Sequence, residues 1–239
     1  MTTQEQGWAT IRQVVIGARD LESTSTQLRE ALGLPVGFAD PLLEDIGLAD
    51  ETLRVGPEAH LEVVAPLTPT ASINGWITKG GGGGGYALSI QVPNAGVLVA
   101  NAERLGVRVV ADLVAYERRI VQLHPGDMGL LVELDEIPQP EQWFWDDIET
   151  AEPEAPVVDD VLAVEVQSGD PKAQARLWAG VLGCEVADGE VPSIELGSRT
   201  VRFVRGERRM LSAVDLRCVD GVTPSERTLV VSGVELRLV

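Results

Sequence analysis

The sequence predicts an α+β fold in which paired βαβββ units form cupped, mixed sheets. The first observation is a recurring order of elements: a strand, a capped helix that stops at Leu-Gly, and then short strands. The second is the alternation of apolar and polar residues within those strands, which is the period of a half-buried strand. The third is the recurrence itself, because similar units repeated along 239 residues indicate an internal repeat.

The first unit opens the chain. Residues 11–18 have strand composition, and Asp20 caps a helical pattern that ends at Gly33. Two short strands follow at 52–55 and 60–64, separated by a Gly-Pro-Glu turn. The predicted order is strand, helix, strand, strand.

The second unit repeats this order after the glycine run 80–85. Its expected elements are a strand at 86–92, a helix from Asn94 to Gly106, and strands at 107–110, 119–123 and 129–134. The glycine run lacks the Lys-Ser/Thr that a phosphate loop requires, so we expect a long loop at the mouth of the sheet, with a closing lid as the alternative.

The second half of the chain holds two more units, the last of them shortened. Strand 161–166 leads to a helix capped by Asp170 and stopped at Gly183. The final unit has strand 211–218 and a hairpin, with too few residues between them for a crossover helix. These patterns predict domains at 8–137 and 158–239, the second truncated, joined by an acidic, proline-rich linker at 138–157 whose aromatic triplet, 143–145, anchors it to a domain.

Composition limits the partners. A net charge of -18 disfavours nucleic acid and anionic membrane surfaces, and favours a small molecule or another protein. Cys184 and Cys218 match no metal or redox spacing and suit a reducing cytosol. The N-terminus lacks a signal-peptide pattern and no apolar run is long enough to span a membrane, so we expect a cytoplasmic protein.

The strand His60-Leu61-Glu62-Val63-Val64 places two titratable side chains on one face. Glu62 and His60 either lie inside a cupped sheet, as a site, or face solvent. His60 has three interpretations: a metal ligand, an acid/base group that works near pH 7, or a residue at the mouth of the strand that hydrogen-bonds to water.

Five strings carry a resemblance to a known family: 15–21, 61–67, 73–80, 122–125 and 131–134. They resemble the vicinal oxygen chelate superfamily, the glyoxalase and bleomycin-resistance fold, and residues 11–136 look most like the methylmalonyl-coenzyme A epimerases within it. The resemblance implies two glyoxalase-like domains in tandem. It also implies a cup around a divalent metal, held by a histidine on the first strand, Glu or Gln on the fourth, histidine on the fifth and glutamate on the eighth.

Carried over to this sequence, those four positions fall on Gln13, Glu62, Ala87 and Glu133. Both glutamates are present and both histidines are replaced. A metal held through Gln13, Glu62 and Glu133 would have oxygen donors only, which favour magnesium, manganese or calcium. The resemblance therefore makes a divalent metal a candidate cofactor with a weakened site.

The same spacing in the second half gives, in the same order, Ala163, then Arg202 or Phe203, then Ala213, and finally Glu235. One carboxylate cannot hold a metal, so we expect residues 158–239 to be a degenerate copy that serves packing, covers the first domain, or pairs with a second copy of the chain in a homodimer.

Two functions remain open. The first is a lyase, isomerase or epimerase that stabilises an enolate or related oxyanion, with Glu133 or His60 moving the proton and Glu62 holding metal or substrate. The second is a bleomycin-resistance type of protein that sequesters a small hydrophobic or aromatic compound without catalysis. The two inward carboxylates favour the enzyme, because they are costly in a purely apolar cup.

Overall fold

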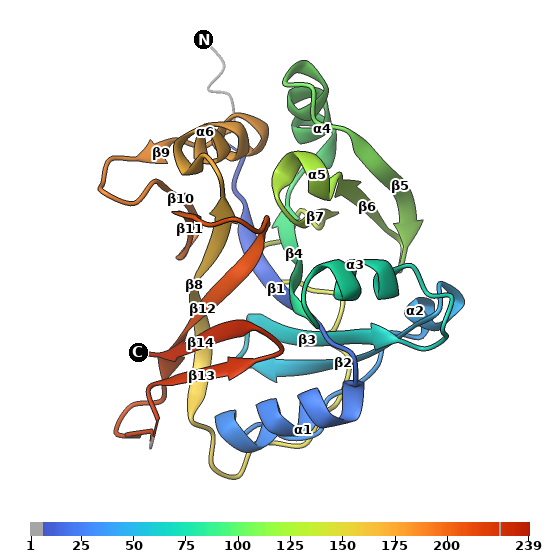
Figure 1. Cartoon of the computed structure of the whole chain (residues 1–239), viewed down its shortest axis with the longest axis vertical. Helices are drawn as coiled ribbons and strands as arrows, with labels where there is room; N and C mark the ends of the chain where they lie inside the picture. Colours follow the sequence, from blue (N-terminus) through green and yellow to red (C-terminus); the bar gives the residue numbers. More distant parts are fainter. Residues whose placement is uncertain (1–6, 225) are drawn as a thin grey trace.

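The computed structural model describes residues 7–224 and 226–239 and shows four copies of one strand pattern in a single 14-stranded mixed sheet (Figure 1). The first half contains β1 (Thr10–Gly17), α1 (Leu21–Leu32), α2 (Pro41–Asp45), β2 (Leu48–Val55), β3 (Ala59–Pro66), α3 (Ile73–Lys79), β4 (Gly84–Val92), α4 (Ala95–Arg104), β5 (Val109–Ala115), β6 (Arg118–Leu123), α5 (Pro125–Met128) and β7 (Leu131–Glu136). The sequence had not indicated the short helices α2 and α3.

The second half follows the same plan in a shorter form. Its elements are β8 (Val158–Ser168), α6 (Pro171–Leu182), β9 (Val186–Ala187), β10 (Ser193–Leu196), β11 (Arg199–Arg205), β12 (Met210–Cys218), β13 (Thr228–Val231) and β14 (Val234–Leu238). Between β12 and β13 the described residues form no helix, as the short spacing had predicted.

Strand pairing confirms the predicted fold class. β1 and β4 pair antiparallel, and each has a parallel partner on its other side, β3 and β7 respectively. The second half repeats this with β8 and β12 in the centre and β11 and β14 outside. The sheet is therefore built from paired modules and is not a doubly wound parallel sheet.

Local capping explains why the two long module helices start and stop where they do. Asp20 accepts a hydrogen bond from the Ser23 amide, and Gly33 ends α1 in the left-handed region at φ 66°. Asp170 and Gly183, at φ 71°, do the same for α6. These boundaries match the sequence prediction because caps depend on residues close in sequence.

The glycine run is where the two halves meet, and it forms the expected loop only in part, because residues 80–83 lie outside the helices and strands. Gly84 and Gly85 begin β4, and Gly85 pairs with Leu211 of β12. A Cβ atom on Gly85 would lie 2.4 Å from the Leu211 Cβ, and one on Gly84 would lie 2.1 Å from the Met210 Cε. Glycine is therefore required for this close approach of the two halves.

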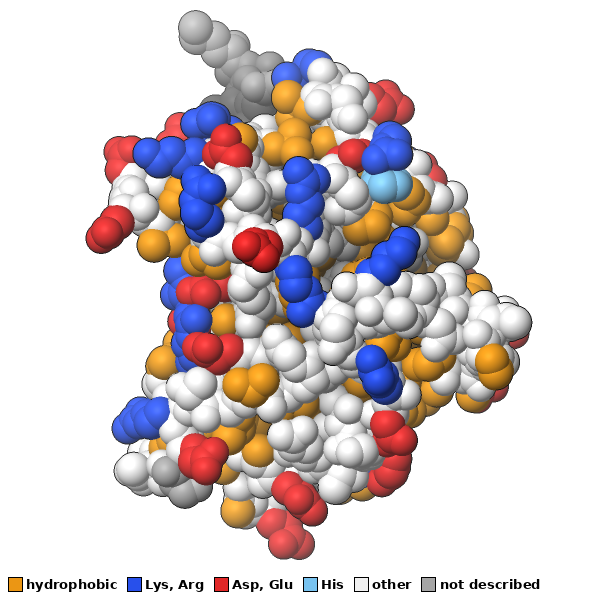
Figure 2. Space-filling model, in the orientation of Figure 1, with side chains coloured by type: hydrophobic (Ala, Val, Ile, Leu, Met, Phe, Trp, Pro, Cys, Tyr) orange, Lys and Arg blue, Asp and Glu red, His pale blue; other side chains and the backbone are white. Residues whose placement is uncertain are grey.

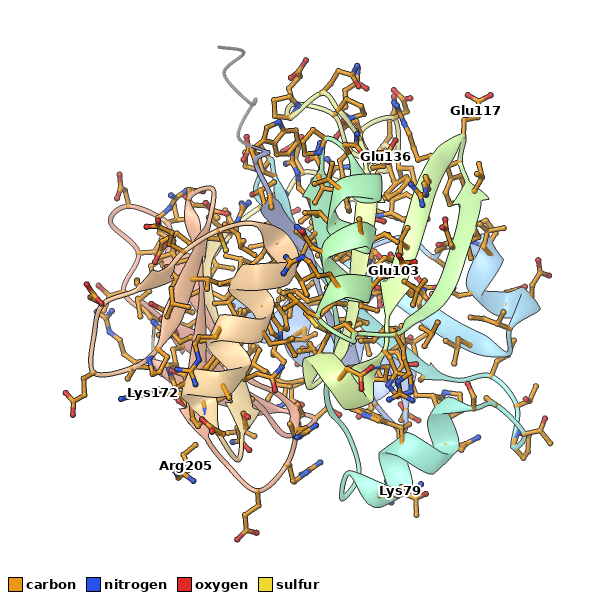
Figure 3. The ribbon with its side chains drawn as sticks, turned by 90° about the horizontal axis from the view of Figure 1, so that it is seen from above. Lys79, Glu103, Glu117, Glu136, Lys172 and Arg205 are labelled. Carbon is orange, nitrogen blue, oxygen red and sulfur yellow. The ribbon has the colours of Figure 1, made fainter. Side chains whose placement is uncertain are left out.

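A helix pair forms a second contact between the halves. α6 lies beside α4, as Figures 1 and 3 both show. The Asn101 Nδ2 donates to the Val181 carbonyl at 3.2 Å, and the Trp178 Nε1 donates to the Met128 carbonyl at 2.8 Å. The predicted boundaries at 8–137 and 158–239 remain a prediction, because the halves share one sheet.

The segment 138–157 closes one end of the first half. Trp143 and Trp145 are each 7% exposed and pack with Phe38 in a separate apolar cluster. Arg54 of β2 holds the segment by donating to the Trp145 carbonyl at 2.8 Å and the Ile148 carbonyl at 3.2 Å. We call the folded segment, residues 137–148, the aromatic plug.

The face of the described residues in Figure 2 shows no large basic area, and the described helices include no membrane-spanning one. On the face drawn in Figure 2, basic and acidic side chains are interspersed, with no continuous basic surface among the described residues there. None of the described helices has both the length and the apolar character needed to cross a membrane.

Candidate functional site

Strands β3, β1, β4 and β7 form a cup whose inner face surrounds a cavity of about 290 Å³. Side chains alternate along each strand, so one row of inward residues comes from each. Register brings Glu62 beside Val15, Ala87 across from Val15, and Glu133 beside Ser89. Gln13, Glu62, Ala87 and Glu133, which the resemblance had singled out, all line this cavity.

Glu62 lies on one wall of the cup. Its side chain is 6% exposed, and its Oε2 accepts a hydrogen bond from the Gln13 Nε2 at 2.6 Å. Burial raises the pKa of Glu62 well above its usual value, and the nearby charge of Asp50 raises this pKa further. Glu62 is therefore held toward its protonated form.

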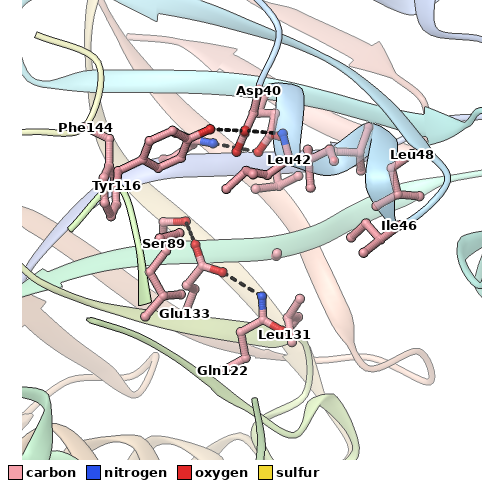
Figure 4. Close-up of a pocket in the computed structure, with 18 of the residues that line it drawn as sticks. Asp40, Leu42, Ile46, Leu48, Ser89, Tyr116, Gln122, Leu131, Glu133 and Phe144 are labelled. Carbon is pink, nitrogen blue, oxygen red and sulfur yellow. Dashed lines mark hydrogen bonds between the residues drawn. The ribbon is translucent and has the colours of Figure 1, made fainter. Parts of the chain in front are cut away.

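Glu133 lies on the other wall, with β1 and β4 between it and Glu62. Figure 4 shows that both of its oxygens are bound: Oε1 accepts from the Ser89 Oγ at 3.3 Å and Oε2 accepts from the Gln122 Nε2 at 2.8 Å. Burial raises the pKa of Glu133, while these two hydrogen bonds oppose the rise. Burial, and not the proximity of like charges, is the main cause of the elevated pKa values of both glutamates.

The four carried-over positions do not fit a divalent metal. Ala87 offers only a methyl group, and the Gln13 Oε1, the atom that would bind a metal, accepts instead from the Trp145 Nε1 at 3.0 Å. The Gln13 amide nitrogen is bound to Glu62 and both Glu133 oxygens are occupied. Within the described ranges, no three His, Cys, Asp or Glu side chains are grouped so as to hold a metal ion.

His60 lies on the same face as Glu62, as predicted, and its ring is edge-on to Phe38, with ring centroids 6.5 Å apart. It does not line the cavity, and it is 1% exposed, so the expectation that it meets water at the strand mouth is wrong. Neither ring nitrogen has a hydrogen-bond partner among the described residues. Burial, with the nearby charge of Arg54, lowers the pKa of His60 to about 3, so the ring is neutral and is not poised for acid/base work near pH 7.

Sequence reasoning missed two parts of the site. Trp143, Phe144 and Trp145 from the plug form a wall of the cavity, and their position in an irregular segment gave no signal for this. Asp40 also lines it, accepting hydrogen bonds from the Tyr116 hydroxyl and the Leu42 amide (Figure 4).

Asp50 is a further acid close to the cavity, which we had not assigned to the site. It is 6% exposed and accepts from the Asp40 amide, and burial raises its pKa to about 7. The alternation in β2 could have placed it on the face of Thr52, which pairs with Glu62.

The second half has the same register with different residues. Glu165 pairs with Arg202 and Ala213 as Val15 pairs with Glu62 and Ala87. Asp215 pairs with Arg237 as Ser89 pairs with Glu133. Arg237 is therefore the counterpart of Glu133, and our assignment of Glu235 was wrong by two residues. Among the alternatives for the Glu62 counterpart, the register selects Arg202 over Phe203.

No protein-family model matches this chain. The ethylmalonyl-CoA/methylmalonyl-CoA epimerase of Cereibacter sphaeroides is 30% identical over 135 residues, which are 53% of this chain and 97% of the relative. The mitochondrial methylmalonyl-CoA epimerase of Mus musculus is 29% identical over 130 residues and 72% of its length.

Solved structures match over most of the chain. A mutant of 4-hydroxymandelate synthase from Streptomyces coelicolor superposes with a TM-score of 0.68 at 15% identity, covering 89% of this chain and 71% of the synthase. A hypothetical protein from Staphylococcus aureus also gives 0.68, at 10% identity, over 97% of this chain and 99% of its own. At these identities the likeness is one of fold.

Proposed function

The chain belongs to the vicinal oxygen chelate superfamily, and from that premise we propose that its first cup is the active site of a proton-transfer isomerase, epimerase or lyase. The observation that carries the proposal is the pair Glu62 and Glu133, two carboxyl groups on opposite walls of one cavity, of which Glu62 is buried and Glu133 half-buried. Relatives named as epimerases of acyl-CoA compounds support a reaction next to a carbonyl group.

The two glutamates differ in a way that assigns their roles. The pKa of Glu62 is raised well above its usual value, whereas Ser89 and Gln122 stabilise the ionised form of Glu133 and limit the rise. Pairs of titratable groups whose environments separate their pKa values commonly divide acid and base work. Glu133 is therefore the proposed base and Glu62 the proposed acid.

The proposed step needs no metal. A Glu133 oxygen takes the proton from the carbon next to the substrate carbonyl, and the C–H electron pair moves toward the carbonyl oxygen. The protonated Glu62 donates a hydrogen bond to that oxygen as its negative charge develops. Returning the proton to carbon completes an isomerisation or epimerisation, and loss of a leaving group at this stage would complete an elimination.

Deuterium exchange tests the proposal without knowledge of the natural substrate. Phenylacetone and methylmalonyl-CoA are incubated with the protein in D₂O, and loss of the proton signal next to each carbonyl is followed by NMR. We expect exchange of at least one probe above the solvent rate, with Glu133→Gln at least about 100-fold slower. Glu103→Gln, an exposed change on α4, is the control and should exchange at the parent rate.

Two results would contradict the proposed function. If neither probe exchanges faster than in buffer, or if Glu133→Gln keeps the parent rate while remaining folded by thermal melting, the cup is not a proton-transfer site. A protein that bound either probe without exchange would support the sequestering function instead.

A further inference from the structure

The first cup has an unbalanced set of charges. Among the described residues that line the cavity there are three acids, Asp40, Glu62 and Glu133, and no Lys, Arg or His. The remaining lining is mostly aliphatic and aromatic. Glu62 is held toward its protonated form, so an anionic group that entered this cavity would meet mainly Asp40 and Glu133, without a positive charge to balance it.

Two arginines on the strands of the first half, one on β1 and one on β2, are already engaged elsewhere. Arg12 donates to the Gln91 Oε1, to the Glu58 carbonyl and to the Pro140 carbonyl. Arg54 donates to carbonyl oxygens of the aromatic plug. Both guanidinium groups therefore hold the plug in place, and neither lines the cavity.

Three aromatic rings form part of the cavity wall. Tyr116, Phe144 and Trp145 line the cavity together, with ring centroids 5.5 to 6.0 Å apart. The Tyr116 hydroxyl donates to Asp40, so a carboxylate stands at the edge of this ring group. Aromatic faces beside carboxylates are the chemistry that recognises organic cations in proteins.

The surface next to this cavity is also acidic. A second cavity of about 490 Å³ shares Tyr116, Trp143 and Phe144 with the first and is also lined by Asp146 and Asp147. Its one described cation, Arg118, donates to the Gln142 Oε1 at 3.0 Å. A ligand that extends past the aromatic wall therefore meets more acids than bases.

We propose that the first cup binds a small organic cation, an amine or quaternary ammonium compound with an apolar body, and rejects polyanionic acyl-CoA esters. The inference rests on the proposed function in taking this cavity as the substrate site, and it adds the substrate's charge. The cavity volume, at the small end of ligand pockets, suits one ring and a short cationic arm.

Three benzoyl compounds test the charge preference. Phenacyltrimethylammonium is a permanent cation, phenyl neopentyl ketone is its neutral isostere, and benzoylformate is an anion. Titration calorimetry on the whole chain should give binding of the cation at least about 10-fold tighter than that of the neutral isostere, with no detectable binding of the anion. Methylmalonyl-CoA should likewise show no binding.

Variants separate a specific site from the general attraction of a chain with net charge -18. Asp40→Asn should weaken binding of the cation at least about 5-fold and leave binding of phenyl neopentyl ketone unchanged. Trp145→Ala, which opens the aromatic group, should weaken both ligands. Asp188→Asn, an exposed acid in the second half, is the matched control and should change neither affinity.

Three outcomes would overturn the inference: equal affinity for cation and isostere, tighter binding of benzoylformate or methylmalonyl-CoA, or equal loss of cation binding in Asp40→Asn and Asp188→Asn. None of these depends on turnover. A protein that prefers the cation but exchanges no proton at carbon would keep this inference and lose the proposed reaction, whereas one that exchanges methylmalonyl-CoA would keep the reaction and lose the inference.

Discussion

The two cups of this molecule share a register and differ in charge. Where the first has Glu62 and Glu133, the second has Arg202 and Arg237. The first keeps uncompensated carboxyl groups beside a cavity, whereas the second pairs its arginines with Glu165 and Asp215 at distances from 2.6 to 3.6 Å. The described lining of the first cavity thus has no positive charge opposite its acids, whereas the arginines of the second cup already lie against acids. From this difference we propose the first cup as the ligand site and the second cup as a packing unit.

The largest effect should come from rebuilding a metal site in one cup and not in the other. Gln13→His with Ala87→His places two imidazoles beside Glu62 and Glu133, a ligand set suited to cobalt or zinc. We expect cobalt affinity to rise at least about 1,000-fold, or about 4 kcal/mol, and to need both changes. Titration calorimetry after a thermal melt measures it.

The control for this experiment is the same double change in the second cup, Ala163→His with Ala213→His. These alanines hold the matching register positions, but the neighbours are Arg202 and Arg237, which cannot ligate a metal. Equal cobalt binding by both double variants, or none by either, would contradict the correspondence between the cups.

A pH experiment should give the next largest effect. Burial raises the pKa of Asp50 from 3.8 to about 7, so the folded protein keeps a proton that the unfolded chain releases across that range. Stability is therefore fully present below the unfolded pKa and falls as pH rises through the folded value. Asp50→Asn, which keeps an acceptor for the Asp40 amide, should be about 3 kcal/mol more stable than the parent at alkaline pH and equal to it near pH 3.

Urea unfolding at several pH values measures this difference. Asp45→Asn, an exposed acid on α2, is the control and should show the parent's pH dependence. A parent whose stability rises steadily from pH 4 to pH 8, with Asp50→Asn following the same curve, would mean that Asp50 is ionised in the folded state.

In the second cup, removing one charged group should lower stability, whereas removing the charge of Asp50 in the first half should raise it. Arg237 binds both oxygens of Glu165, at 2.7 and 3.0 Å, and burial alone would raise the pKa of Glu165, but Arg237 and Arg202 together lower it. Arg237→Met should therefore cost about 2 kcal/mol, since it leaves a largely buried carboxylate with fewer partners. Arg217→Met removes an exposed ion pair with Asp159 and should cost less than about 0.5 kcal/mol. If urea unfolding gave equal losses of stability for Arg237→Met and Arg217→Met, the ion pairs of Arg237 would contribute no more than an exposed surface pair.

The smallest effect concerns the aromatic plug, which only the first cup has. Trp145→Phe removes the hydrogen bond to the Gln13 Oε1 and leaves that buried oxygen unpaired, a loss of about 1 kcal/mol beyond the smaller ring. Trp143→Phe is the matched control, because the Trp143 Nε1 has no partner among the described residues. If thermal melting showed that Trp143→Phe lowers the melting temperature more than Trp145→Phe does, the hydrogen bond of Trp145 would not have the stabilising role assigned to it.

Sequence alone could predict the parts of the fold that depend on near neighbours. The caps at Asp20 and Asp170 and the stops at Gly33 and Gly183 lie where expected, because each is decided within one helical turn. Alternation also placed His60 and Glu62 on one face of their strand, but it left open whether that face points inward or to solvent.

Alternation could not predict position along a strand. A period of two is unchanged by a shift of two residues, so Glu235 and Arg237 share a face and the pattern cannot choose between them. The same ambiguity applies to His60 and Glu62: their common face was predicted, but which of them meets the cavity depends on where the plug from residues 137–148 lies. That contact is distant in sequence, and it left no local pattern.

The glycine contact between the halves has a consequence for solubility. Gly83, Gly84 and Gly85 leave the start of β4 without side chains, and residues Ser232, Met210 and Leu211 cover it. A fragment ending in the linker would expose this bare strand edge, and such an edge readily pairs with other chains. The second half, though it lacks the paired glutamates, therefore covers this edge, and cutting the chain at the linker should make the first half more prone to aggregate.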